Sequence, residues 1–244
     1  MTSLAATAII CAVRPHGEHG AIVRALTEEA GLLAGYVQGG RSSRMRPVLI
    51  PGNVVRGLFR ARTAEQLAGL SVELERSRGP LLAEPLPAAA IDWACALTAA
   101  TLPEHQPYPS LWSGLGAVLD AVEAAPAARG WAVALVRYEQ LLLAELGFGL
   151  DLAECAVTGA REGLVWISPR TGRAVTEEGA GGRQERLLPL PAFLTQGGEA
   201  GWPEIFAGFS LTGHFLLQNL FDPRRQDVLA ARERLIERLK RAVA

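Results

Sequence analysis

Arginines are concentrated in one stretch of this 244-residue chain, and their type and spacing suit phosphate binding. No Asp or Glu lies between residues 30 and 64. The guanidinium group is planar, contacts phosphate through two parallel hydrogen bonds and stacks on bases. A solvated face is the alternative for any such run, but the lack of counter-charges favours a polyanion, single-stranded nucleic acid above all. The candidate DNA contacts are Arg14, Arg41, Arg44, Arg46, Arg56, Arg60 and Arg62.

The spacing of these arginines predicts two groups. Arg56, Arg60 and Arg62 have even spacing, which places them on one side of a strand that has no bulge. The other three in the window, residues 41 to 46, lie on the preceding loop, where they would close one edge of a groove. The net charge of −1 hides this asymmetry, because residues 1–80 carry +4 and the remainder −5.

Tyr36 and Phe59 are the only aromatic residues among the first 80 and are therefore candidates for base stacking. Each suits the core of a small barrel equally well. Both alternatives stay open, and we expect binding to depend mainly on charge.

Motifs for catalysis and metal binding are missing from the sequence. His16, Glu18 and His19 lie close together, but Pro15 and Gly17 place them in a turn and not on a metal-binding helix. His214 lies in an apolar helical segment and is interpreted as a core histidine. The chain contains neither a nucleophile elbow nor a phosphate-binding loop with its lysine. We therefore expect no enzyme activity and no cofactor.

Three widely spaced cysteines, Cys11, Cys95 and Cys155, have mainly apolar neighbours. An odd number in such surroundings favours buried thiols in a reducing compartment over a disulfide framework. The first 13 residues have no basic residue before their apolar stretch, and no uncharged run reaches about 20 residues. We expect a soluble, cytoplasmic protein that does not contact membranes.

Short apolar runs in the first 80 residues predict a five-stranded barrel. Turn-forming residues separate the runs. The expected strands are residues 6–14, 19–27, 31–38, 52–61 and 67–75.

After Pro80 the pattern changes to Ala and Leu at helical spacing. We place a domain boundary there, with a barrel domain over residues 1–79 and a helical domain over residues 80–244, giving an α+β fold. A turn-rich segment at 150–190 predicts a small irregular module or exposed hairpin. The expected helices are residues 88–102, 111–125, 131–146, 202–220 and one beginning at Asp222 and Pro223.

Several segments occur in an order and spacing typical of one protein family. They are Arg14-Pro-His-Gly-Glu-His, Leu26-Thr-Glu-Glu-Ala-Gly, Gly39-Gly-Arg-Ser-Ser-Arg-Met-Arg with Leu49-Ile-Pro, Arg137-Tyr-Glu followed by Leu-Gly-Phe-Gly-Leu-Asp-Leu, and Leu187-Leu-Pro-Leu-Pro-Ala-Phe-Leu. Together they resemble the RecO family of recombination mediators over nearly the whole chain. The resemblance implies an N-terminal OB-fold that binds single- and double-stranded DNA and anneals complementary strands. It also implies RecR and single-strand-binding protein as partners, and a nucleoid-associated location.

One departure from the family pattern concerns zinc. Zinc-bearing members carry two Cys-x-x-Cys pairs where this chain has Cys155 with Thr158 and Thr176 with Gly179. A structural zinc ion needs four donors, so we expect no zinc. The hairpin would instead be held by packing of Val157, Leu164, Trp166 and Ile167.

Arg137 is a candidate contact for the acidic, Phe-terminated tail of single-strand-binding protein. Trp131, Val133 and Leu141 flank it, which would place the cation at the rim of an apolar groove. The alternative is that Arg137 only pairs with a neighbouring carboxylate. For the whole protein, the alternative function is an OB-fold adaptor that binds protein or RNA and contacts DNA weakly.

Overall fold

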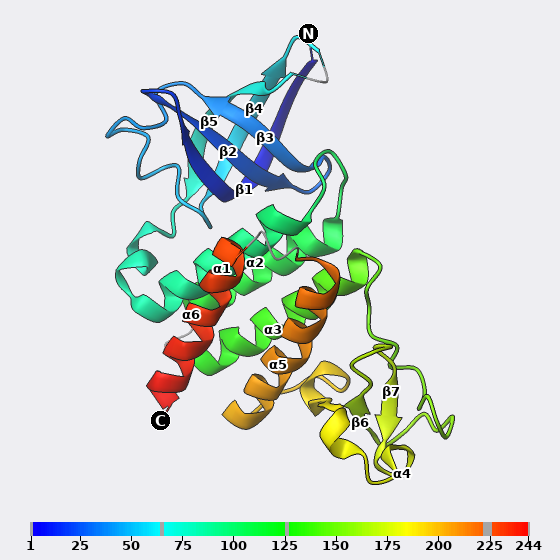
Figure 1. The fold of residues 1–244 in the computed structure, drawn as a ribbon. Helices are drawn as coiled ribbons and strands as arrows, with labels where there is room; N and C mark the ends of the chain where they lie inside the picture. Colours follow the sequence, from blue (N-terminus) through cyan, green and yellow to red (C-terminus); the bar gives the residue numbers. More distant parts are fainter. Residues whose placement is uncertain (1, 64–65, 125–126, 222–225, 244) are drawn as a thin grey trace. The chain divides into compact units, whose positions relative to one another are not determined.

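The computed structural model describes residues 2–63, 66–124, 127–221 and 226–243 (Figure 1). Contacts divide the chain into two compact units. One comprises Met1–Ala124 with Asp227–Ala242, and the other comprises Ala125–Gln226 with the last two residues. None of the helices in the described ranges has the length and apolar character needed to cross a membrane.

The first unit begins with a closed five-stranded barrel in the order β1-β2-β3-β5-β4. All neighbouring strands are antiparallel except β3 and β5, which close the barrel as a parallel pair. The α+β fold with an N-terminal barrel is thereby confirmed. The strands are β1 (Thr2–His16), β2 (Gly20–Thr27), β3 (Gly31–Val37), β4 (Val54–Ala61) and β5 (Ala68–Arg76).

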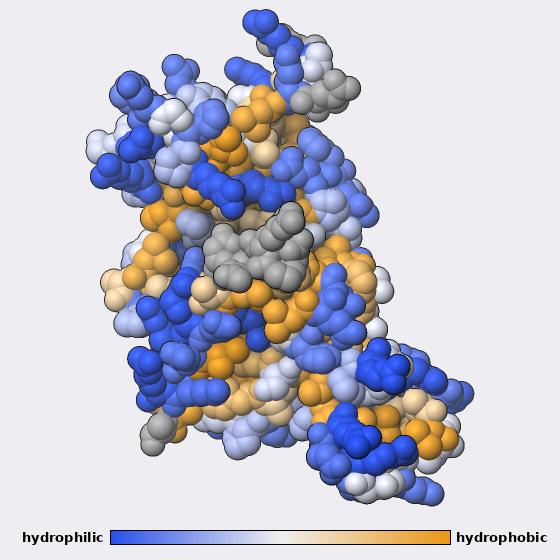
Figure 2. Space-filling model, in the orientation of Figure 1, coloured by the Kyte–Doolittle hydropathy of each residue, from blue (hydrophilic) through white to orange (hydrophobic). Residues whose placement is uncertain are grey.

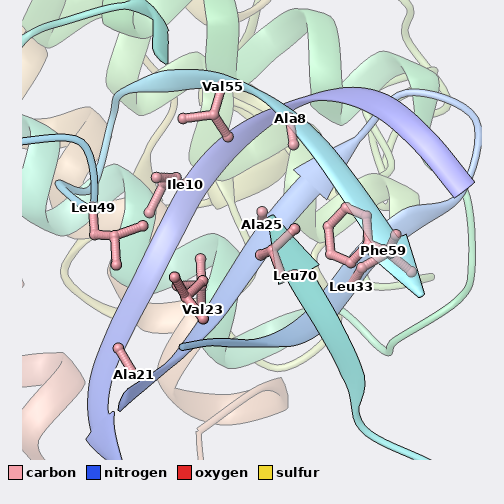
Figure 3. Packing of buried hydrophobic residues seen from close by; sticks show 11 residues of the cluster. Ala8, Ile10, Ala21, Val23, Ala25, Leu33, Leu49, Val55, Phe59 and Leu70 are labelled. Carbon is pink, nitrogen blue, oxygen red and sulfur yellow. The ribbon is translucent and has the colours of Figure 1, made fainter. Parts of the chain in front are cut away.

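Strand β1 is longer than the sequence predicts, because it begins at Thr2 and not at residue 6. Residues Thr2–Ile9 of β1 pair with β4, and residues Ala8–His16 pair with β2. The register of the β1–β2 pair shifts between Ile10 and Ala12. A bulge of this kind bends a strand and lets a sheet close. Inside the barrel, Ile10, Leu33 and Leu70 belong to one apolar cluster (Figure 3).

Three helices complete the first unit: α1 (Pro85–Thr101), α2 (Pro109–Ala124) and α6 (Gln226–Val243). Trp93 and Leu119 are fully buried in this unit, as are Leu235 and Leu239 from the apolar stripe of α6. A short 3₁₀ turn, Gly79–Ala83, connects β5 to α1. The expected start of the last helix at Asp222 and Pro223 lies outside the described residues.

The second unit contains α3 (Ala128–Glu145) packed against α5 (Trp202–Asn219). Gly208 permits the close approach, because a Cβ atom there would lie 2.9 Å from Val136 Cγ1. The buried Thr212 hydroxyl donates a hydrogen bond to Glu139 across the same pair.

A small three-stranded sheet lies in the 150–190 segment, where the sequence indicates an irregular module. Its order is β7 (Ala174–Thr176), β6 (Leu164–Ile167) and β8 (Leu188–Pro189), with one helical turn, α4 (Glu177–Ala180), after β7. Leu164 and Trp166 pack against a buried cluster around Cys155, and Ile167 is buried, as expected. The expectation for Val157 is wrong, because it lies in a turn outside the sheet with 63% of its surface exposed.

Candidate nucleic-acid interface

The arginines of β4 lie on the outer face of the barrel because side chains alternate along a strand. Val55 and Phe59 point into the core, so Arg56 and Arg60 point outward and are exposed. Arg62 is also exposed, one residue beyond the end of β4. Figure 2 shows hydrophilic side chains over much of the barrel surface in that view.

Carboxylates lie closer to Arg56 than the sequence suggests. Antiparallel pairing of β4 with β5 places Glu73 directly opposite Arg56. Glu75 Oε1 lies 3.9 Å from Arg56 Nη1, and its other oxygen accepts a hydrogen bond from the Thr7 hydroxyl. Arg60 instead lies between Ser3 and Gly69 in the strand register. Arg60 is therefore freer than Arg56 to bind phosphate.

The loop after β3 carries Arg41, Arg44 and Arg46 on consecutive turns whose end is anchored by buried Leu49. Arg41 Nη1 donates to the Glu18 carbonyl at 3.0 Å, and the Arg41 amide donates to the His19 carbonyl. Arg41 thus ties the loop to the turn between β1 and β2.

Five of the seven candidate arginines are exposed, and their side chains make no hydrogen bond or ion pair with any described residue. Their guanidinium groups have all donors available to a ligand, so an anion would not displace an existing partner. They are Arg14, Arg44, Arg46, Arg60 and Arg62.

The two aromatic candidates lie on opposite sides of the barrel wall. Phe59 is only 5% exposed and packs in the core near Leu33 and Leu70 (Figure 3). Tyr36 lies on the outer face, half-buried, where its ring meets that of His16 edge-on at 5.9 Å. Of the alternatives that the sequence left open, the structure places Phe59 in the core and leaves Tyr36 accessible.

Sequence comparisons cover both units of this arrangement. The family models "Recombination protein O N terminal" and "Recombination protein O C terminal" match residues 1–78 and 85–227. A DNA repair protein RecO from Rhodospirillum centenum is 46% identical over 96% of this chain and 94% of its own length. Proteins of the same name from Paracoccus denitrificans and Cereibacter sphaeroides are 45% and 43% identical over 95% and 96% of this chain, and 94% and 96% of their own lengths. The chain belongs to the RecO family.

In this RecO-family chain, the four positions that the sequence analysis compared with zinc ligands lie close to one sulfur atom. Cys155 Sγ accepts hydrogen bonds from the amides of Thr158 at 3.4 Å and Thr176 at 3.3 Å. A Cβ atom on Gly179 would lie 2.8 Å from the same sulfur. Thr158, Thr176 and Gly179 therefore all lie around the one thiol, that of Cys155. Among the described residues, no three His, Cys, Asp or Glu side chains gather as metal ligands would.

The Cys155 thiol differs electrostatically from the other two. Burial raises its pKa, but the donors on Thr158 and Thr176 outweigh this effect and lower the pKa from its ordinary value to about 6. Burial dominates at Cys11 and raises the pKa there to about 12.

Arg137 of the RecO-family helical core is half-buried on α3 and is held by carbonyl groups. Its Nη2 donates to the carbonyls of Phe193 at 3.2 Å and Gly198 at 3.0 Å, and the guanidinium lies 5.8 Å from the Phe193 ring centre. The flanking residues Trp131 and Val133 are buried. The contacts of Arg137 are thus carbonyl and aromatic, unlike the carboxylate pairing considered from sequence.

Sequence reasoning missed the contact of His16 with the Tyr36 ring. Its packing against Tyr36 depends on the pairing of β1, β2 and β3, which a search for local motifs does not detect.

Proposed function

We propose that this protein is a recombination mediator in DNA repair that acts by binding and without catalysing a reaction. It binds single- and double-stranded DNA through the barrel and anneals complementary strands. With RecR it helps load recombinase onto DNA covered by single-strand-binding protein. The observation that carries the DNA-binding part is the set of five exposed arginines on the barrel and its loops whose side chains have no partner among the described residues. A nucleoid-associated, cytoplasmic location follows from this role.

A mediator must hold a flexible strand without locking it, because annealing requires the strand to move in register with its complement. Charge contacts to phosphate suit this, since they tolerate any sequence and exchange with salt ions. Arginines distributed over β1, β4 and the loop after β3 supply such contacts without base readout.

The test is annealing of complementary oligonucleotides, bare and coated with single-strand-binding protein, over a range of salt. We expect faster annealing of both, with single-strand affinity falling steeply as salt rises. Weak, salt-insensitive DNA binding without annealing would contradict the proposal and favour an adaptor that binds protein. Hydrolysis of DNA or ATP in the same mixtures would contradict the non-enzymatic role.

The acidic tail of single-strand-binding protein is proposed to dock beside Arg137. In the described part of the chain, the side-chain hydrogen bonds of Arg137 all use Nη2. The remaining guanidinium donors can meet a carboxylate while the aromatic contact with Phe193 is kept.

A further inference from the structure

A row of residues crosses all five strands of the barrel on its outer face. Each neighbouring pair in the row consists of Cα partners in the strand register. Because Phe59, Leu70 and Val23 point inward, the residues beside them in sequence point outward. From β4 round to β1, the row reads Arg60, Gly69, Tyr36, Ile22 and Arg14.

The Tyr36 ring in this row is fixed in place by its neighbours. A Cβ atom at Gly20 would lie 2.3 Å from Tyr36 Cε2, so the ring occupies the space that any side chain at position 20 would fill. His16 is the strand partner of Gly20 and packs edge-on against the ring. The ring is held before any ligand arrives, which reduces the entropy lost when a ligand stacks on it.

Beside Tyr36, Gly69 leaves a bare strip of β5. Gly69 is exposed, and within 4 Å of the place where its Cβ atom would lie there is only the Arg60 carbonyl, at 3.8 Å. Neighbouring strands are about 4.8 Å apart, so the open strip separates the backbones of Tyr36 and Arg60 by about 10 Å. A flat group can rest there beside Tyr36, whose ring extends over Gly20 on the neighbouring strand β2.

The row also has cations on both sides and no carboxylate within it. Arg60 and Arg14 flank the aromatic and glycine positions, and neither guanidinium group is engaged by a described residue. An aromatic ring, a flat strip and flanking guanidinium groups match an unpaired nucleobase whose adjoining phosphates extend to either side.

We infer that Tyr36, with Gly20 and Gly69, forms a seat for one unpaired base of single-stranded DNA. The inference rests on the proposed DNA binding by the barrel and adds to it a means of distinguishing strand types. A duplex presents its phosphates to the arginines but keeps its base faces stacked inside, so the seat contributes only to the single-strand complex. The arginines hold either form of DNA.

The first test compares a natural oligonucleotide with one of equal length that lacks bases. Tyr36→Ala is expected to weaken binding of the natural strand about 5- to 100-fold, with unchanged affinity for the abasic strand and for duplex. Tyr36→Phe keeps the ring and should keep the affinity. An equal loss on natural, abasic and duplex DNA, or no loss on any, overturns the base seat.

The second test places a side chain over the exposed backbone at Gly69 and leaves Tyr36 and the arginines unchanged. Gly69→Leu should lower affinity for the natural strand at least severalfold while leaving the abasic strand unaffected, because the leucine covers the place of the base. Ser71→Leu is the matched control, since Ser71 is exposed on the same strand and the same face two residues away. Equal affinities of the two variants for the natural strand overturn the assignment of Gly69.

The two failures are distinguishable. If the wild-type protein binds no DNA, the proposed function fails. If it binds natural and abasic strands equally and in a salt-dependent way, phosphate binding stands and the base seat alone is wrong.

Discussion

Arg41, Arg44 and Arg46 lie on one loop but differ in what their guanidinium groups contact. The Arg41 guanidinium donates to the β1–β2 turn, while those of Arg44 and Arg46 have no partner among the described residues. Replacing Arg44 and Arg46 together by Ala should reduce the magnitude of the log-log salt slope for single-strand binding by about 1.4. The melting temperature should not change, because neither side chain is buried.

The control for this variant is Arg161→Ala with Arg170→Ala, which removes the same charge from exposed positions in the other unit. A salt slope equal to that of wild type in the Arg44 and Arg46 variant would place the DNA elsewhere. Arg41→Ala should weaken binding and also lower the melting temperature, since the loop loses its tie to the turn.

Cys155 gives a prediction for pH. A thiol whose folded pKa is about 6, against an ordinary value of 9.0, binds fewer protons folded than unfolded between these pH values. Its contribution to stability is therefore fully present above pH 9 and is lost as pH falls towards 6. In denaturant titrations, the difference in unfolding free energy between wild type and Cys155→Ala should become smaller as the pH falls from 9 to 6. Thr176→Val removes the hydroxyl next to Cys155 and should raise the pKa of that thiol. Thiolate absorbance as a function of pH measures this pKa. An unchanged pKa would show that the backbone amides alone cause the shift.

The junction between β5 and α1 is stabilised by Arg78, which is 2% exposed. Its Nη1 donates to the Gly52 carbonyl at 2.7 Å, and the guanidinium also pairs with Asp120 and Glu123 on α2. Arg78→Ala leaves a buried carbonyl unsatisfied and should cost about 3 kcal/mol of unfolding free energy. Arg76→Ala is the control, because Arg76 pairs with the same carboxylates from a half-exposed position and should cost less than about 1 kcal/mol. Similar losses in denaturant titrations would show that the ion pairs dominate over the buried hydrogen bond.

At the level of elements, local patterns predicted most of the architecture. The five barrel strands and the helices α1, α2, α3 and α5 lie within a few residues of the expected ranges, because each depends on periodicity and turn residues near in sequence. The early start of β1 could not be predicted, since residues 2–5 become a strand by pairing with residues 58–61.

Long-range pairing also explains which parts of the candidate site were missed. The acid-free window is acid-free only along the sequence, because Glu73 and Glu75 reach Arg56 from β5. The position of Phe59 was predictable in principle, since outward Arg56 and Arg60 require an inward residue between them. The neighbourhood of Tyr36 and Gly69 depends on a parallel pairing across 33 residues, which no local pattern reveals.

For the whole molecule, we predict that removing Arg137 separates two activities. Arg137→Ala should lose affinity for a peptide of the single-strand-binding protein tail and slow annealing of coated strands. Annealing of bare strands should persist, because the barrel arginines are unchanged. Arg129→Ala, at an exposed position on the same helix, should affect neither. Unchanged peptide affinity would remove Arg137 from the tail site, and an equal loss on bare and coated DNA, with a lowered melting temperature, would show a folding defect.

The seam between β3 and β5 consists of two residue pairs, Gly35 with Ala68 and Tyr36 with Gly69, whereas the other pairs of neighbouring strands share seven or eight. Such a short, sequence-distant seam closes late in folding and opens first in the native ensemble. The pair Tyr36 with Gly69 is also part of the proposed base seat, so bound single-stranded DNA would bridge the two β-strands that separate most easily. Oligonucleotide binding should therefore slow amide hydrogen exchange at β3 and β5 more than at the β1–β2 pair. Bound DNA would then stabilise the closed form of the barrel.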